Sequence, residues 1–125
     1  MNKIKFFAVA LASALTLTSG AAMASGDATK GKKVFNKCKA CHSTEAGKKK
    51  IGPSMFGVVG RKAGTAEGFR FSDAMKDSGL TWNEDTLEKF LKKPKKLVKG
   101  TKMSFAGLKK ESQIEDVIAY MKTLK

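Results

Sequence analysis

Few side chains in this sequence can bind a metal or a cofactor. Its 125 residues include one histidine, two cysteines, one tryptophan and one tyrosine. A single histidine excludes sites that need two imidazoles, and two cysteines exclude a scaffold held by several disulfides. No run alternates apolar and polar residues, so the sequence predicts no β-sheet.

Acidic residues are also scarce. The chain has 11 Asp and Glu against 25 Lys and Arg, which gives a formal charge of +14. A surplus of this size predicts acidic partners and encounters steered by charge. Charge alone also fits a nucleic-acid-binding module, but neither an aromatic stacking stripe nor a recognisable reading motif accompanies it. We therefore expect no nucleic-acid partner.

The start of the chain has the pattern of a secretory signal. Two lysines precede an apolar run over residues 6–17, and small residues follow. The run is shorter than the roughly 20 residues of a transmembrane helix, which argues against an uncleaved anchor. We predict a signal peptide over residues 1–24, cleaved after about Ala24, and one domain over residues 25–125. Because the two lysines are the only charges of the leader, the predicted mature chain has a formal charge of +12.

Apolar spacing predicts an all-α domain with a long glycine-rich loop. Helices are expected over residues 27–39, 72–79 and 83–92, the last of them ended by Pro94. Gly31 lies on the apolar face of the first helix, where glycine costs about 1 kcal/mol relative to alanine, so we predict a close helix crossing there. The clearest helical stripe is C-terminal, with apolar residues at spacings of three and four: Ile114, Val117, Ile118, Met121 and Leu124.

The stretch "CKACHSTEAG", residues 38–47, holds both cysteines and the histidine. Cys38 and Cys41 are three residues apart, so on a helical turn their side chains project to the same side. Both can form thioethers with the two vinyl groups along one edge of a haem, and His42 can then reach the iron. The C-x-x-C-H pattern therefore predicts covalent attachment of a c-type haem.

Three other interpretations of this stretch are weaker. A thioredoxin-like dithiol needs a βαβ context, which the chain lacks. A structural zinc site usually takes four protein ligands, and this stretch supplies three. Export permits a disulfide, but a bridge that closes so small a loop stabilises little.

The second axial ligand cannot be another histidine. The domain contains four methionines: Met55, Met75, Met103 and Met121. Met121 belongs to the C-terminal stripe and is explained as core, whereas Met55 and Met75 are ambiguous. Met103 lies between two predicted helices, with Gly100 and Gly107 allowing a tight loop. A thioether from this loop would favour the reduced iron, although a gap-filling methionine is the alternative.

Five motifs in order carry a family resemblance: "GKKVFNKCKACH", "IGPSMFGVVGRKAG", "GLTW", "KKPKKLVKGTKMSFAG" and "EDVIAYMK". Over residues 26–123 the chain resembles class I cytochromes c, similar to mitochondrial cytochrome c and to soluble bacterial periplasmic cytochromes c. The resemblance implies a small all-α domain whose helices and loops wrap one covalent haem. It also implies that Gly31 and Phe35 cross the C-terminal helix near Val117 and Tyr120.

The resemblance implies a haem site of eight residues: Cys38, Cys41, His42, Pro53, Arg61, Trp82, Met103 and Phe105. Within this set, His42 and Met103 are the iron ligands, and the Pro53 carbonyl accepts a hydrogen bond from the His42 ring. Arg61 and Trp82 lie near the haem propionates. Phe105 covers the haem edge beside Met103.

Three positions depart from the common family pattern. Phe71 stands where relatives often have a tyrosine near a propionate, and Phe90 replaces a tyrosine that commonly hydrogen-bonds towards the methionine sulfur. Met75 replaces a commonly seen asparagine of an internal polar network. Each change removes a polar partner, so we expect more apolar haem surroundings that alter the redox potential and the strength of the methionine bond.

The resemblance implies a soluble periplasmic electron carrier rather than an enzyme, because a closed iron site leaves no position for a substrate. A monomer that contacts membrane complexes transiently is the simplest expectation for a carrier that must leave each partner quickly. The expected partners are acidic docking faces of redox complexes, such as a quinol-oxidising complex, a terminal oxidase, a reductase or a photosynthetic reaction centre. Seven lysines are candidates for the docking surface: Lys37, Lys39, Lys95, Lys96, Lys99, Lys102 and Lys109. A haem enzyme or gas sensor, the competing class, would need an open sixth position.

Overall fold

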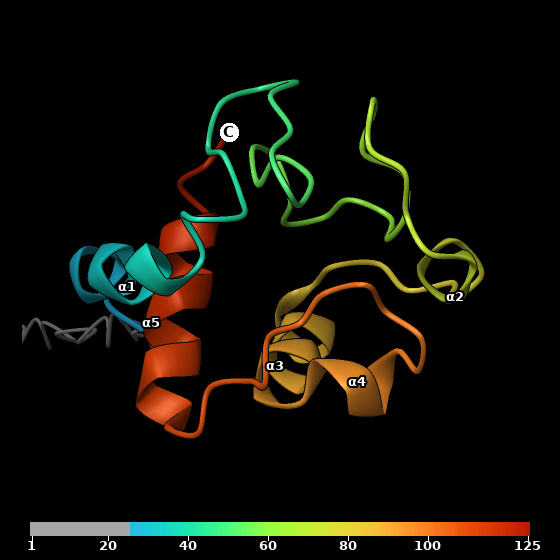
Figure 1. The fold of residues 1–125 in the computed structure, drawn as a ribbon. Coiled ribbons are helices and arrows are strands. Elements are labelled where there is room, and N and C mark those ends of the chain that lie inside the picture. The colour runs from blue at the N-terminus through green and yellow to red at the C-terminus, as the bar shows by residue number, and fades with distance from the viewer. Residues whose placement is uncertain (1–25) are drawn as a thin grey trace, which may run out of the picture.

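Helices joined by long loops form the domain, as the sequence predicts. The structure is a computed structural model that describes residues 26–125, so the predicted signal peptide lies outside the described residues. The helical segments follow in this order (Figure 1): α1 (Ala28–Val34), η1 (Phe35–Lys37), α2 (Asp73–Lys76), α3 (Glu84–Lys92), α4 (Pro94–Leu97) and α5 (Glu111–Met121). Within residues 26–125 the β-type pairing is confined to a bridge between Lys62 and Thr81. The all-α class is therefore confirmed.

Helix α1 begins where the sequence predicts but ends earlier. The Asp27 carboxylate accepts hydrogen bonds from the backbone N–H groups of Thr29 (2.8 Å) and Lys30 (3.1 Å), which caps the helix. The predicted helix over residues 27–39 is too long, because the chain tightens after Val34 into the 3₁₀ turn η1. Tightening of this kind is common at helix ends, and it leads directly into the turn that carries the cysteines.

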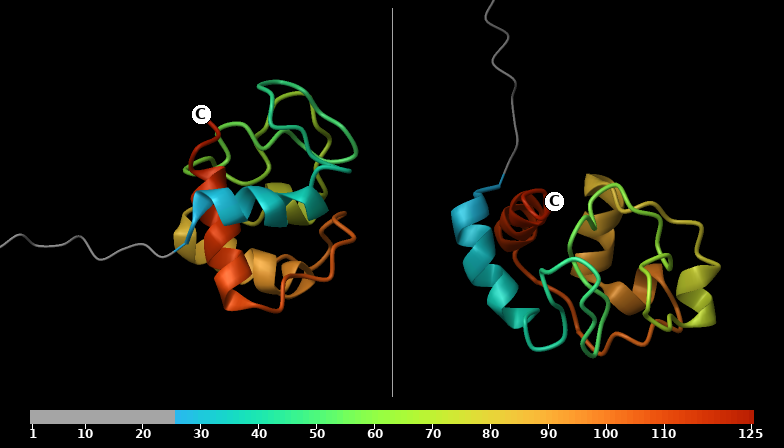
Figure 2. Two further views of the ribbon diagram at one scale, coloured as in Figure 1. Left: turned by 90° about the vertical axis from the view of Figure 1, so that its left-hand side faces the viewer. Right: turned by 90° about the horizontal axis from the view of Figure 1, so that it is seen from above.

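Helices α1 and α5 cross at the position of Gly31, as predicted. Figure 2 shows the two helices against each other in both views. A Cβ atom at Gly31 would lie 1.9 Å from the backbone oxygen of Asp116, so only glycine permits this approach. Beside the crossing, the rings of Phe35 and Tyr120 pack with centroids 5.2 Å apart, and Val117 is fully buried.

The apolar stripe of α5 is buried except at its end. Ile114, Val117, Ile118 and Met121 all belong to the core. Leu124 lies beyond the helix and is only partly buried, because the chain turns after Met121: the Leu124 N–H donates to the Met121 carbonyl at 3.1 Å. None of the helices within residues 26–125 has the length and apolar character needed to cross a membrane.

Helix α3 is set by a capping box. The Asn83 side chain accepts from the Thr86 N–H at 2.9 Å, and the Thr86 hydroxyl accepts from the Asn83 N–H at 3.0 Å. Its buried stripe is the one predicted: Leu87, Phe90 and Leu91. The helix ends at Lys92, but Pro94 also begins α4, a short helix that we did not predict. Proline suits the first position of a helix because its φ is fixed and its missing N–H is not needed there.

Helices α3 and α5 bring several carboxylates together, and this predicts a pH effect on stability. The pKa of Glu88 is raised, first by a hydrogen bond shared with Glu111, then by partial desolvation and by the negative charges of Glu111, Asp85 and Glu115. A carboxyl whose pKa is higher in the folded state binds more protons there, so stability falls as pH rises through the window above its ordinary pKa. We expect Glu88→Gln to unfold at a higher temperature than the wild type at pH 7.

The gain from Glu88→Gln should disappear in acid, below the ordinary glutamate pKa of about 4.3, where the wild-type carboxyl is protonated in both states. Thermal unfolding followed by circular dichroism between pH 3.5 and 7.5 measures this difference. Glu67→Gln removes an equal charge from an exposed loop residue and serves as the control. A gain that is equally large in acid, or equally large for the control, would show that repulsion around Glu88 is not its source.

Candidate functional site

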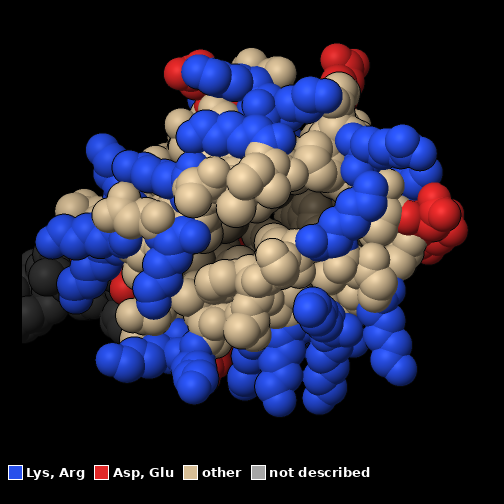
Figure 3. Space-filling model, in the orientation of Figure 1, with Lys and Arg blue, Asp and Glu red and all other residues tan. Residues whose placement is uncertain are grey.

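A cavity of about 270 Å³ lies between α3, the segment after α4 and the loops that follow η1. Figure 3 shows the face of Figure 1 hollowed near its centre, with Lys and Arg side chains around the hollow. Large apolar side chains form much of the wall: Phe69, Phe71, Trp82, Leu87, Phe90 and Leu91. All eight predicted site residues line this cavity: Cys38, Cys41, His42, Pro53, Arg61, Trp82, Met103 and Phe105. Loops far apart in sequence therefore place the predicted set in one cavity.

The two cysteines lie on one turn, as expected, but η1 ends at Lys37, so the predicted helix over residues 27–39 does not reach Cys38. The N–H groups of Cys41 and His42 both donate to the Cys38 carbonyl, at 3.1 and 2.9 Å. Both cysteine side chains are partly buried and form no disulfide within the described part of the chain. The pKa of the Cys38 thiol is raised by burial and by the neighbouring Cys41, against a lowering by Lys37. Burial therefore favours the neutral thiol form of Cys38.

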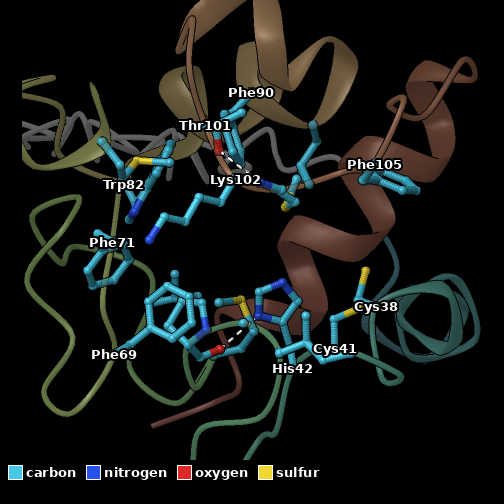
Figure 4. A pocket seen from close by; sticks show the side chains of 18 of the residues that line it. Cys38, Cys41, His42, Phe69, Phe71, Trp82, Phe90, Thr101, Lys102 and Phe105 are labelled. Atoms are coloured by element: carbon cyan, nitrogen blue, oxygen red, sulfur yellow. Dashed lines mark hydrogen bonds between the residues drawn. The ribbon is translucent and has the colours of Figure 1, made fainter. Parts of the chain in front are cut away.

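The His42 ring is held from one side and directed into the cavity (Figure 4). Its Nδ1 lies 2.7 Å from the Pro53 carbonyl oxygen. Because a carbonyl can only accept, Nδ1 carries the proton and Nε2 keeps its lone pair for the cavity. Burial lowers the pKa of His42, the Pro53 hydrogen bond raises it, and Arg61 lowers it. The result favours a neutral imidazole, which is the form that binds a metal.

Gly52 lets the backbone approach the His42 ring closely. A Cβ at this position would lie 2.4 Å from Cε1 and 2.7 Å from Nδ1 of the ring. The Gly52 N–H also donates to the Cys41 carbonyl at 2.7 Å. The segment before Pro53 is thus pressed against both the ring and the cysteine turn, and this contact fixes the orientation of the imidazole.

The opposite wall comes from the segment after α4. Figure 4 shows Thr101, Lys102 and Phe105 across the cavity from His42. Met103 belongs to this segment, and its backbone N–H donates to the Thr101 hydroxyl at 3.3 Å. Two side chains with metal-binding chemistry, a thioether and an imidazole, therefore enter one cavity from separate segments.

The Met103 segment is anchored at both ends. Lys102 reaches across the cavity mouth, and its Nζ donates to the Arg70 carbonyl at 3.1 Å. At the other end, a Cβ at Gly107 would lie 2.1 Å from the backbone oxygen of Lys92, the last residue of α3. Gly107 has a φ of 111°, which also favours glycine. The segment is therefore held against α3 on one side and against the facing loop on the other.

Arg61 contributes a half-buried cation to the wall. Its Nη1 and Nη2 donate to the carbonyls of Phe56 (3.2 Å) and Ser54 (3.1 Å). Burial lowers the pKa of Arg61, and no carboxylate of the described residues pairs with it. The guanidinium is thus fixed in direction while its charge has no anionic neighbour, which is an environment that suits an acidic group of a ligand.

The three side chains that depart from the family pattern all pack in apolar surroundings. Phe71 packs edge to face on Phe69, with centroids 4.8 Å apart, and Phe90 packs on the indole of Trp82 at 4.9 Å. Met75 is 8% exposed and belongs to the core. Apolar neighbours therefore surround all three, in agreement with the apolar environment that we expected.

Comparison with known proteins decides the family. Residues 28–125 match the family model for cytochrome c. The chain belongs to the cytochrome c family. It is 59% identical over 91 residues to cytochrome c2 iso-2 of Magnetospirillum molischianum, covering 73% of this chain and 94% of that protein. It is 48% identical over 121 residues to cytochrome c2 of Rhodomicrobium vannielii, covering 96% and 97%.

A solved structure of similar fold is that of cytochrome cH from Methylobacterium extorquens. The two chains are 52% identical in sequence, and their superposition covers 78% of this chain and 99% of the other with a TM-score of 0.75. The small single-domain class I cytochrome c fold is therefore confirmed. Members of this family carry electrons and are not enzymes.

The cavity fits the covalent haem c of this family. Cys38 and Cys41 lie on one turn at its wall and form no disulfide with each other, so they would be available for the two thioether bonds. The wall is largely apolar, Gly52 leaves the imidazole room, and Arg61 offers a cation for a carboxylate group. The zinc interpretation gains no support, because residues 26–125 contain no group of three His, Cys, Asp or Glu side chains placed to hold a metal ion.

Sequence reasoning missed several residues of this site. The Thr101 hydroxyl accepts a hydrogen bond from the Met103 N–H two residues later. A Ser or Thr two residues before a loop position is a sequence signal for this kind of turn. Phe69 lines the cavity from an irregular loop, where no periodicity could have shown it. The stripe of α3 was predicted as buried, and the structure shows that this burial is against the cavity.

Proposed function

We propose that this cytochrome c is a periplasmic electron carrier in which His42 and Met103 are the two axial ligands of the haem iron. The observation that carries the proposal is that the single histidine and Met103 enter one cavity together with both cysteines. The fixed tautomer of His42, with Nε2 directed into the cavity, supports its role. The bound haem supplies a one-electron couple, since its iron can alternate between two oxidation states.

The surrounding residues would orient the haem and exclude water. The Pro53 carbonyl holds the His42 ring and raises its basicity. Arg61, together with Trp82, would face the propionates. Arg61 forms no ion pair with a carboxylate of residues 26–125, which supports this role. Phe105, which is half-buried on the cavity wall, would cover the haem edge beside Met103.

Export is the second part of the proposal. The leader would be cleaved after about Ala24 and would deliver residues 25–125 to the periplasm. Two observations support this. The match to the Rhodomicrobium vannielii protein spans 121 residues and therefore extends into the leader. The match to the Magnetospirillum molischianum protein covers 94% of that protein with only 91 residues. That protein is therefore shorter than this chain by about the length of the predicted leader.

The partners would be redox complexes with acidic docking faces, such as a quinol-oxidising complex, a terminal oxidase, a reductase or a photosynthetic reaction centre. All seven candidate docking lysines are exposed: Lys37, Lys39, Lys95, Lys96, Lys99, Lys102 and Lys109. Exposed positive charges of this kind steer encounter and leave dissociation fast, which suits a monomer that meets each partner briefly.

Charge steering predicts a strong salt dependence. We expect the second-order rate of electron transfer to a purified terminal oxidase to fall on the order of tenfold or more between about 10 mM and 500 mM ionic strength, as screening shortens the Debye length from about 30 Å to under 10 Å. Stopped-flow measurement of oxidation of the reduced protein gives the rate. A rate that stays flat across this range would contradict steering by the lysines.

Redox-monitored visible spectroscopy of the exported protein tests the proposal as a whole. A covalent haem should stay with the polypeptide through extraction with acidic acetone, and a far-red band in the oxidised form should report the bond between methionine and iron. Amino-terminal sequencing should begin at Ser25. Extractable pigment, a five-coordinate reduced form, or rapid binding of carbon monoxide would instead favour a haem enzyme or a gas sensor.

A further inference from the structure

Two polar side chains are buried in the part of the chain that the structure describes, and both lie beside the His42 contact. Ser43 follows His42 directly and is 6% exposed, and Ser54 follows Pro53 and is 8% exposed. A buried hydroxyl costs free energy unless hydrogen bonds replace the water that it loses. The hydrogen-bond partners of each serine therefore show what that serine holds in place.

The Ser54 hydroxyl joins two loops, whereas the Ser43 hydroxyl stays within its own turn. Ser54 Oγ donates to the Glu45 carbonyl at 2.5 Å and accepts from the Phe56 N–H at 3.1 Å. Ser43 Oγ accepts from the Glu45 N–H at 3.0 Å, two residues later. The Ser54 side chain thus ties its own segment to the loop that follows the cysteine turn, and the Ser43 side chain does not.

The tied segment, residues 53–56, carries the carbonyl that holds the imidazole. The Pro53 carbonyl oxygen lies 2.7 Å from His42 Nδ1. Arg61 donates to two other backbone carbonyls of the same segment, at 3.1 and 3.2 Å. One short segment therefore orients two groups of the cavity wall, the imidazole and the guanidinium.

We infer that Ser54 is a positioning residue for electron transfer, whose hydroxyl holds the Pro53 carbonyl on the His42 ring and thereby lowers the reduction potential. The inference rests on the proposed ligand role of His42. A carbonyl held against Nδ1–H makes the imidazole a stronger donor to the iron. A stronger donor favours oxidised iron, and hydrogen bonding around the ligands is one of the factors that set the potential of a haem.

The test compares Ser54→Ala with Ser43→Ala in the haem-containing protein. Both variants remove a buried hydroxyl, and Ser43 is closer to His42 in sequence, so general damage near the ligand would affect the control at least as much. Glu45 is exposed, so water can replace the Ser43 hydroxyl at its N–H. The backbone bond from the Met55 N–H to the Ser43 carbonyl, at 2.8 Å, remains in both variants.

Two measurements report on the Pro53 contact. Hydrogen exchange at His42 Nδ1 is followed by NMR in the reduced, diamagnetic protein relative to the amides of α5, and the reduction potential is measured by redox titration. We expect Ser54→Ala to speed the relative exchange at Nδ1 by about tenfold, the order of change that loss of one hydrogen bond produces. We also expect its reduction potential to rise. Ser43→Ala should match the wild type in both measurements.

Three results would contradict the positioning role of Ser54 and leave the carrier function standing. They are equal acceleration at Nδ1 and in the α5 amides, which would show that Ser54 stabilises the whole domain, an unchanged potential in Ser54→Ala, and equal changes in Ser43→Ala. A different result would overturn the ligand role itself. In that case the His42 ring protons of the wild type would lack the upfield shift that a haem causes in an axial ligand.

Discussion

Substitution of Gly31 by alanine should destabilise the protein by about 3 kcal/mol or more. A Cβ at this position would lie 1.9 Å from the Asp116 oxygen and 2.9 Å from Cβ of Tyr120. Overpacking typically costs about 1–3 kcal/mol, and this overlap is deeper than a neighbouring rotamer change can relieve because the oxygen belongs to the α5 backbone. The better helix propensity of alanine returns only about 1 kcal/mol. For a domain of this size the loss corresponds to a fall in Tm of roughly 12–24 °C.

Thermal unfolding of the haem-containing protein, followed by circular dichroism, measures the effect of Gly31→Ala. Gly47→Ala is the control, since no atom lies within 4 Å of its added Cβ, and its φ of 71° leaves only backbone strain of about 1–2 kcal/mol. If Gly31→Ala unfolds within a few degrees of the wild type, the contact between α1 and α5 is more adaptable than the structure shows.

The fold was predictable where the sequence is locally consistent. The N-cap at Asp27, the stripe of α3 and the stripe of α5 depend on contacts between near neighbours in sequence, and all three are found as expected. The ends of elements were less predictable. Helix α1 shortens where the chain enters the cysteine turn. Leu124 leaves α5, and its carbonyl accepts a hydrogen bond from the Gly57 N–H of a distant loop.

The candidate site was predictable in its membership but not in its geometry. The cysteine spacing and the resemblance named the eight residues, and all of them line one cavity. Nothing in the spacing of the chain could show that Gly52 packs on the His42 ring, or that Lys102 reaches the carbonyl of Arg70. Those contacts join separate segments of irregular loop, and their geometry depends on the path that each loop takes.

Replacing Met103 by leucine should open the sixth iron position while the fold is kept. Leucine is close in volume to methionine, so the substitution usually costs less than about 1.5 kcal/mol in stability, but it has no sulfur lone pair. We expect the far-red band of the oxidised protein to vanish and the reduction potential to fall, because a methionine ligand favours reduced iron. Carbon monoxide should bind the reduced protein at least about tenfold more tightly, because it no longer competes with the methionine sulfur for the iron. Each 1.4 kcal/mol of binding free energy corresponds to a factor of about ten in affinity.

Three matched variants distinguish the ligand from a methionine that merely lines the cavity. Met55, Met75 and Met121 all contribute to the same wall, and leucine at any of them leaves the Met103 thioether in place. Each of these variants should keep the far-red band and a slow reaction with carbon monoxide, as measured by visible spectroscopy and flash photolysis. If Met75→Leu loses the band and Met103→Leu keeps it, the iron ligand is Met75, and our assignment of Met103 is wrong. Absence of the band from the wild-type protein would mean that no methionine binds the iron, and the closed site on which the proposed electron transfer depends would have to be given up.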